Sequence, residues 1–191
     1  FEETQLISWP SSTYKDGFEL NPYLIWEKGF FARYYHSIST PKGFSYVSSA
    51  ISDNSIVDSF PDFAWDWLQL SSNEAIINDE KFVVRHAAEV EARTILLNCV
   101  ESLVEPYFAC LNANSLMQDD ESVRSRLTDA VSIDFLRSNI NANWDWSRLT
   151  QRVYKTINLK AMGNASWIDK WDWDFLSNSL EVDVILEYAE S

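Results

Sequence analysis

The triplet Trp-Asp-Trp occurs three times in this chain of 191 residues, beginning at Trp65, Trp144 and Trp171. A leucine follows each copy at the same distance, so the shared pattern is Trp-Asp-Trp-x-x-Leu. Each indole carries a large apolar surface that has to pack against other parts of the chain. The pattern is therefore either a structural element that the fold uses repeatedly or a site that occurs three times.

The spacing within each copy matches the start of an α-helix. An aspartate at the N-cap accepts hydrogen bonds from the first free backbone N–H groups, which stabilises a helix by about 1 kcal/mol. The preceding tryptophan and the leucine then form a hydrophobic staple, and the second tryptophan is the first helical residue, with a ring that we expect to be buried. The predicted helix starts are Trp65, Asp66, Trp67 and Leu70; Trp144, Asp145, Trp146 and Leu149; and Trp171, Asp172, Trp173 and Leu176.

The residues after the first copy predict a second helix in the same unit. A polar Ser/Asn turn and Ala75-Ile76-Ile77 are followed by Asn78 and Asp79, which can cap a helix. Trp144 and Trp171 are 27 residues apart, and the 79 residues from the first copy to the second are close to three such units. Periods of this length are typical of stacked helical repeats, with two intervening units that lack tryptophan.

The segment "WDWLQLSSNEAIINDEKFV" resembles the short Trp-x-Trp-x-x-Leu-Ser-x-Asn-x-x-Ile repeats of large DNA virus proteins and bacterial multidomain proteins. The resemblance covers residues 63–85 well, and residues 143–150 and 169–188 in part. Glu74 stands where those repeats often have proline, and Leu149-Thr150 replaces Leu-Ser. The resemblance implies a helical repeat module within a larger protein and carries no catalytic residues.

The composition changes near residue 62, since four of the five prolines and three of the four glycines precede it. We therefore expect an aromatic-rich segment of short helices and turns over 1–61, with helices near 21–37 and 46–59, and a repeat-like region over 62–191. The predicted fold is mostly α, an irregular, solenoid-like stack of helical repeats.

Helical periodicity in the second region predicts two longer helices. One extends from Phe82 to Val104, before Pro106, and the other from Asp120 to Ser138, with Asp119 and Asp120 at its N-terminus. The inward residues of the first are Val84, Ala88, Ala92, Ile95, Cys99 and Leu103, and those of the second are Val123, Leu127, Val131 and Phe135.

The net charge of −14, from 29 acidic and 15 basic residues, argues against direct binding to nucleic acid. No apolar stretch reaches the roughly 20 residues of a membrane helix. We expect Cys99 and Cys110 to be reduced thiols of a cytoplasmic protein, because one helix would place them about 16 Å apart. The chain begins at Phe1 without a leader pattern, so we expect a segment of a longer polypeptide.

Candidate sites for chemistry are few, and we predict no catalytic residue, cofactor or metal. Asp169, Asp172 and Asp174 could bind a hard cation, but the other copies retain only the capping aspartate. His86 and Glu89, three residues apart, could form an acid/base pair, although a solvated pair is the commoner outcome.

The C-terminal residues predict an interaction surface, because an apolar stripe there has no following repeat to cover it. Its candidate residues are Val182, Ile185, Leu186, Glu187 and Glu190. We expect a non-enzymatic interaction or scaffold module that binds a protein partner, or flanking domains of the same polypeptide, through an acidic surface.

Three alternatives stay open. One is an acidic mimic of nucleic acid that regulates a nucleic-acid enzyme, and another is an accessory or sensor segment of a bacterial defence-type multidomain protein. The third is an enzyme with a polar pocket built around His36 and Tyr34 or Tyr35.

Overall fold

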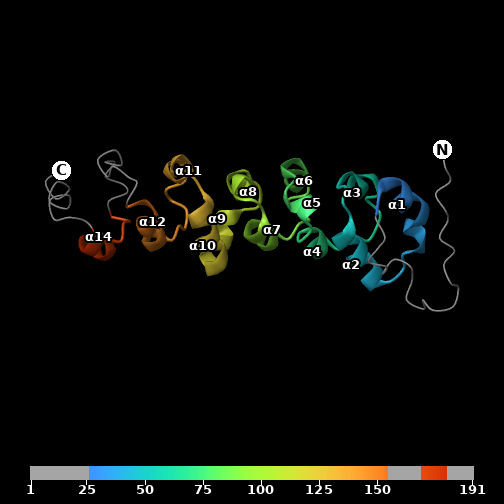
Figure 1. Cartoon of the computed structure of the whole chain (residues 1–191), viewed down its shortest axis with the longest axis horizontal. Helices are drawn as coiled ribbons and strands as arrows, with labels where there is room; N and C mark the ends of the chain where they lie inside the picture. The colour runs from blue at the N-terminus through green and yellow to red at the C-terminus, as the bar shows by residue number, and fades with distance from the viewer. Residues whose placement is uncertain (1–25, 155–168, 180–191) are drawn as a thin grey trace. The chain divides into compact units, whose positions relative to one another are not determined.

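The computed structural model describes residues 26–154 and 169–179. Within these ranges the regular secondary structure is helical, in short α-helices and two turns of 3₁₀ helix (Figure 1). The extended pairing there is a single bridge between Trp26 and Ile51. The predicted mostly α fold is confirmed. None of the helices in these ranges combines the length and the apolar character needed to cross a bilayer.

The chain divides into two compact units, Phe1–Ile76 and Ile77–Ser191. The division falls after the first Trp-Asp-Trp start rather than at the change in composition near residue 62. Trp65 therefore belongs to the N-terminal unit, whereas Trp144 and Trp171 belong to the C-terminal unit.

The N-terminal unit begins, within the described residues, at Trp26. Its helices are α1 (Lys28–Tyr34), η2 (Tyr35–Ser37), α2 (Pro41–Ala50), α3 (Ser55–Ser59) and α4 (Trp67–Leu70), followed by α5 (Glu74–Ile77) at the division.

The prediction of one helix over 46–59 is wrong, because α2 and α3 are separate helices. Thr40 starts α2 early by accepting the N–H of Gly43 at 3.0 Å, and Pro41 occupies its first turn, where no N–H is needed. The backbone then becomes extended at Ile51. The helix predicted near 21–37 corresponds to α1 and η2, and residues 21–25 lie outside the described ranges.

An aromatic cluster forms the core of the N-terminal unit around the fully buried Phe31. The Trp65 ring stacks on Phe31 with centroids 5.3 Å apart, and the rings of Phe60 and Phe63 meet Phe31 edge-on at 4.9 and 5.0 Å. The first Trp-Asp-Trp start is therefore anchored in this cluster.

The C-terminal unit contains a longer succession of short helices. They are α6 (Glu80–Arg85), α7 (Ala92–Asn98), η3 (Glu101–Leu103), α8 (Val104–Cys110), α9 (Ala113–Asp119), α10 (Glu121–Ala130), α11 (Ile133–Ser138), α12 (Trp146–Val153) and α14 (Trp173–Ser179).

The predicted long helix from Phe82 to Val104 is wrong, because α6, α7 and η3 occupy this range. Glu91 begins α7 by accepting the N–H of Thr94 at 2.6 Å, so a local cap interrupts the periodic stripe. Val84 consequently lies 49% exposed. Pro106 does not end a helix but lies in the first turn of α8, where its missing N–H has no intrahelical partner to lose.

The predicted helix from Asp120 to Ser138 is also divided. Asp120 caps α10, as expected, by accepting the N–H groups of Ser122 and Val123. Ser132 then caps α11 by accepting the N–H of Phe135 at 3.2 Å, so that the chain turns at Val131. The expected inward residues of α10 are buried, but Phe135 is only half-buried.

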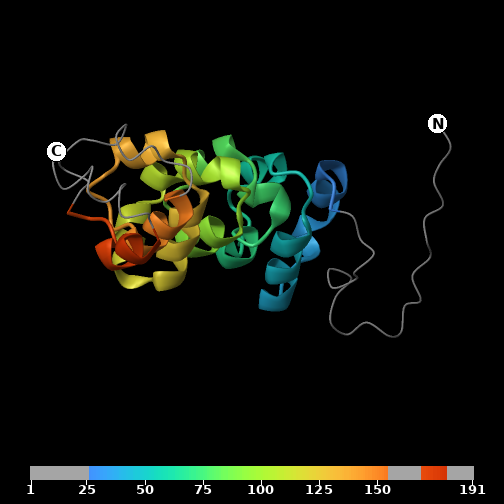
Figure 2. The same ribbon diagram turned by 60° about the vertical axis from the view of Figure 1, so that its left-hand side comes forward.

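One row of helices crosses the C-terminal unit. α10 contacts both α7 and α12, and α12 contacts α14 (Figure 1). The yellow to red helices α10, α12 and α14 also lie together in the second view (Figure 2). In the N-terminal unit α2 and α4 are in contact in the same way.

Two leucines of α4 offer a direct test of this packing. Leu70 is fully buried, whereas Leu68, two residues away, is 54% exposed. We expect Leu70→Ala to lower the free energy of unfolding by about 2–5 kcal/mol, because it leaves a cavity in the core. Leu68→Ala is the matched control and should change it by no more than about 0.5 kcal/mol. Urea denaturation measures both, and equal losses would contradict this packing.

Candidate functional site

The aspartate of each triplet is the N-cap of a helix. Its Oδ1 atom accepts the backbone N–H three residues later: from Gln69 to Asp66 at 3.2 Å, from Arg148 to Asp145 at 2.9 Å, and from Phe175 to Asp172 at 3.0 Å. The same local geometry therefore occurs three times.

The two tryptophans of a triplet differ in their surroundings. The first indole of each copy is buried, as is the leucine of each copy. The second indole is half-buried in Trp67 and Trp146 and 36% exposed in Trp173, which differs from the expectation of a buried ring. The ring of Trp146 packs edge-on against Trp171 of the next copy, with centroids 5.8 Å apart.

Two of the three buried indole N–H groups donate to a carbonyl in the loop that precedes their copy. Trp65 Nε1 donates to the carbonyl of Phe60 at 2.9 Å, and Trp144 Nε1 donates to the carbonyl of Asn139 at 2.8 Å. Both acceptors lie five residues before the tryptophan. This contact removes the cost of burying the polar edge of the indole.

A hydroxyl from the preceding helix of the row binds the backbone of each capping aspartate. The N–H of Asp66 donates to Ser48 Oγ at 2.9 Å, that of Asp145 to Thr128 Oγ1 at 3.2 Å, and that of Asp172 to Thr150 Oγ1 at 3.1 Å. All three hydroxyl residues are fully buried. They join α2 to α4, α10 to α12, and α12 to α14.

In two of the three copies the second carboxylate oxygen of the cap accepts a hydrogen bond from a side chain on the same preceding helix. Ser45 donates to Oδ2 of Asp66, and Ser147 donates to Oδ2 of Asp172 at 2.6 Å. Each of these serines stands three residues before the hydroxyl described above. Arg93 of α7 makes the corresponding contact with Oδ2 of Asp120 at the start of α10.

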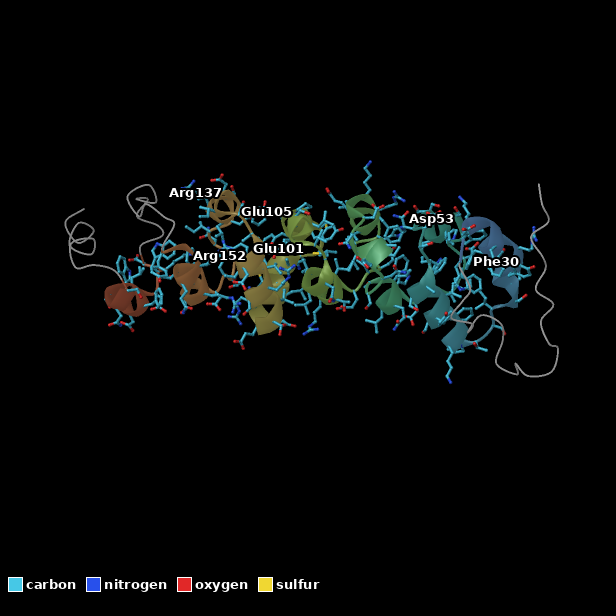
Figure 3. All side chains as sticks on the ribbon, viewed as in Figure 1. Phe30, Asp53, Glu101, Glu105, Arg137 and Arg152 are labelled. Atoms are coloured by element: carbon cyan, nitrogen blue, oxygen red, sulfur yellow. The ribbon has the colours of Figure 1, made fainter. Side chains whose placement is uncertain are left out.

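In two of the three copies a polar side chain also binds the carbonyls at the end of the preceding helix. Asn73 and Arg152 both stand eight residues after the first tryptophan of their copy, and Arg152 is labelled on α12 in Figure 3. Asn73 Nδ2 donates to the carbonyls of Ser48, Ser49 and Ile51 at 3.2, 3.2 and 2.9 Å. The guanidinium of Arg152 donates to those of Thr128, Asp129 and Val131 at 2.6, 2.6 and 3.0 Å.

These six carbonyls occupy equivalent positions at the ends of α2 and α10, where helical carbonyls lack intrahelical partners. The amide of Asn73 and the guanidinium of Arg152 thus make equivalent hydrogen bonds in the two units. Arg126 makes a smaller version of this contact, donating to the carbonyl of Cys99 after the end of α7 at 3.1 Å.

We refer to these three contacts together as the helix joint: the hydroxyl that binds the cap N–H, the side chain that binds the second cap oxygen, and the donor to the carbonyls of the preceding helix end. Sequence reasoning missed the joint, although a signal was present. "SRLT" occurs at 125–128 and again at 147–150, and "SYVS" at 45–48 has the same polar and apolar order.

Hydrogen bonds to the cap lower the pKa of two capping carboxylates. The hydrogen bonds from Ser147 and from the N–H of Phe175 lower the pKa of Asp172. The hydrogen bond from Arg93, assisted by the N–H groups of Val123 and Ser122, lowers the pKa of Asp120. In both cases the partners stabilise the charged form of the carboxylate.

The remaining candidates for chemistry are separated. Asp169 and Asp174 are exposed while Asp172 is engaged in the joint, and no three His, Cys, Asp or Glu residues of the described ranges converge as a metal site would require. His86 and Glu89 lie in a turn after α6 rather than on one helix, and the exposed His36 packs its ring on Tyr35.

Two further predictions concern the cysteines and the C-terminal interface. Cys99 and Cys110 are free thiols, and burial raises the pKa of each. The predicted interface of Val182, Ile185, Leu186, Glu187 and Glu190 lies outside the described residues.

Comparison with known proteins adds no identification. No protein family matches the chain, and no curated protein or solved structure is significantly similar to it.

The buried hydroxyl of a joint can be tested at Thr150, which accepts the N–H of Asp172 and donates to the carbonyl of Trp146. We expect Thr150→Val to lower the free energy of unfolding by about 1–3 kcal/mol, because it leaves a buried N–H without an acceptor. Thr150→Ser keeps the hydroxyl and should cost less, as measured by urea denaturation. A larger loss in the serine variant would show that the methyl group, not the joint, matters.

The lowered pKa values predict a dependence of stability on pH. A carboxyl with a pKa lowered in the folded state stabilises the fold above its unfolded pKa, near 4, and loses this contribution as pH falls through its folded pKa. We therefore expect the melting temperature to fall between pH 5 and pH 2 by more in the wild type than in Asp172→Asn or Asp120→Asn. An unchanged pH dependence in both variants would contradict the assignment.

Proposed function

We propose that this chain is a non-enzymatic interaction or scaffold module, a segment of a larger cytoplasmic protein that belongs with the Trp-x-Trp helical repeats that it resembles. The module binds a protein partner through its acidic outer surface. The single observation that carries this proposal is the helix joint, because it assigns the recurring polar and aromatic residues to the contacts between helices.

The joint supports a repeat stack because successive helices are linked by equivalent bonds. Asp66, Asp145 and Asp172 receive a hydroxyl-mediated contact from the preceding helix in two different units of the chain. A stack that is held together in this way has its outer side chains available for binding.

The exposed charges favour a basic partner. Of the acids in the C-terminal unit, Glu89, Asp119 and Glu121 are exposed and form no ion pair with the described residues. The exposed Arg93, Arg137 and Arg148 are paired with aspartates of the same unit. The unpaired surface charge is therefore largely negative, which steers positively charged surfaces toward it.

The same geometry ranks the alternatives below this proposal. A mimic of nucleic acid needs its carboxylates on the surface, whereas the capping aspartates accept hydrogen bonds within the fold. A pocket around His36 would support an enzyme, but His36 is exposed on a short 3₁₀ turn.

A binding experiment tests the acidic surface. Immobilised wild-type chain captures its partner from a native lysate, and the purified partner is then titrated at about 0.15 M and 0.5 M salt. We expect affinity to fall with salt, and the triple variant Glu89→Gln, Asp119→Asn and Glu121→Gln to bind roughly three- to tenfold more weakly, because these charges steer association.

Lys81→Gln removes an exposed positive charge from the same unit and is the matched control. Its affinity should be equal to or higher than that of the wild type. If the affinity changed neither with salt nor in the triple variant, the acidic surface would be excluded as the binding site. Failure to bind any protein, together with turnover of a substrate by the isolated chain, would exclude the module itself. Competition by duplex DNA for the captured partner would favour the mimic.

A further inference from the structure

A pocket of about 270 Å³ lies beside the second Trp-Asp-Trp start in the C-terminal unit. Its lining is uncharged and combines one aromatic ring with several polar side chains. The lining residues are Phe108, Asn114, Ser138, Asn139, Ile140, Asn141 and Ala142.

The loop at this pocket has the same backbone as the loop before Trp65. In the N-terminal unit the N–H of Phe60 donates to the carbonyls of Ile56 and Val57, and the N–H of Phe63 donates to that of Phe60. In the C-terminal unit Asn139 donates to Phe135 and Leu136, and Ala142 donates to Asn139. The indole N–H of Trp65 or Trp144 then closes each loop on the residue five positions earlier.

The aromatic partner of the indole is also equivalent in the two units. Trp65 stacks on Phe31 with centroids 5.3 Å apart and planes inclined by 17°. Trp144 stacks on Phe108 with centroids 5.4 Å apart and planes inclined by 23°. Phe108 therefore stands where Phe31 stands in the first unit.

The two loops differ in the side chains that face these phenylalanines. Phe60 and Phe63 each place a ring edge-on against Phe31. Their positional equivalents are Asn139 and Ala142, an amide and a methyl group, and both line the pocket together with Phe108. Phe108 also has an edge-on ring of its own, that of Phe135 at 5.3 Å, where the first unit has Ile56. The pocket therefore corresponds to part of the space that Phe60 and Phe63 fill in the first unit.

We propose that this pocket binds one aromatic ring that carries a hydrogen-bonding group such as a phenol. The ring lies against Phe108, as Phe63 lies against Phe31. A cavity of about 150 Å³ already accommodates benzene, so the pocket has room for a substituted ring. This inference does not depend on the acidic surface.

Two asparagines of the lining supply the polar partners. Asn139 uses its Nδ2 to donate to the carbonyl of Phe135, which leaves its Oδ1 as an acceptor. Asn114 accepts from Asn143 through Oδ1, and its Nδ2 makes no hydrogen bond to the described residues. One acceptor and one donor match a phenol hydroxyl, which both donates and accepts.

The test is an NMR titration of the whole chain with p-cresol, followed at the side-chain amides of Asn114 and Asn139 and at the methyl of Ala142. We expect saturable shifts with a Kd in the ~millimolar range, as suits a ligand of this size. Ala142→Phe should weaken binding at least tenfold, because its ring fills the pocket as Phe63 does. Asn139→Phe should do the same and serves if Ala142→Phe is misfolded.

Ala109→Phe adds a ring at an exposed position of α8 and is the matched control, with unchanged binding expected. N-acetyltyrosinamide distinguishes the source of the ring: at least tenfold tighter binding than p-cresol indicates a tyrosine of a protein, and equal or weaker binding indicates a free small molecule. The proposal would be overturned if the wild type showed no saturable shifts. It would also be overturned if Ala142→Phe and Asn139→Phe both bound p-cresol as tightly as the wild type.

Discussion

The backbone N–H of a capping aspartate and the hydroxyl of the helix before it form the contact on which the rows of helices depend. The helices are short, and α4 spans only Trp67–Leu70. An isolated helix of that length does not persist in water, because the first turn costs more conformational entropy than its few hydrogen bonds return. The joint stabilises such helices by satisfying at once the orphan groups at the end of one helix and at the start of another.

The capping aspartate combines three tasks in one residue. In Asp172, Oδ1 accepts the N–H of Phe175 within the helix, while Oδ2 and the backbone N–H reach Ser147 and Thr150 of α12. A serine or asparagine could cap the helix, but its single neutral acceptor oxygen could not replace both oxygens of the carboxylate. The use of aspartate at positions 66 and 172 therefore follows from the joint as well as from capping.

Local features of the fold could be predicted from the sequence, and distant ones could not. Asp66, Asp79 and Asp120 cap helices because the interaction spans three residues. The predictions of two long helices were wrong because Glu91 and Ser132 each start a new helix within an otherwise periodic apolar stripe. Asn73 and Arg152 escaped notice because unlike side chains do equivalent work on carbonyls more than 20 residues away. The pocket at Ala142 could not be predicted because the two equivalent loops share their backbone hydrogen bonds but few residues.

The hydroxyl contact also decides how parts of a unit can open. The first amide groups of a helix normally exchange with solvent early, because no intrahelical acceptor protects them. The amide of Asp145 instead donates to Oγ1 of Thr128, whose side chain is fully buried. We expect this amide to exchange when α12 moves away from α10, and Asp172 is linked to α12 in the same way. We therefore expect fraying at these helix starts to be coupled to the separation of neighbouring helices, and α10, α12 and α14 to open together.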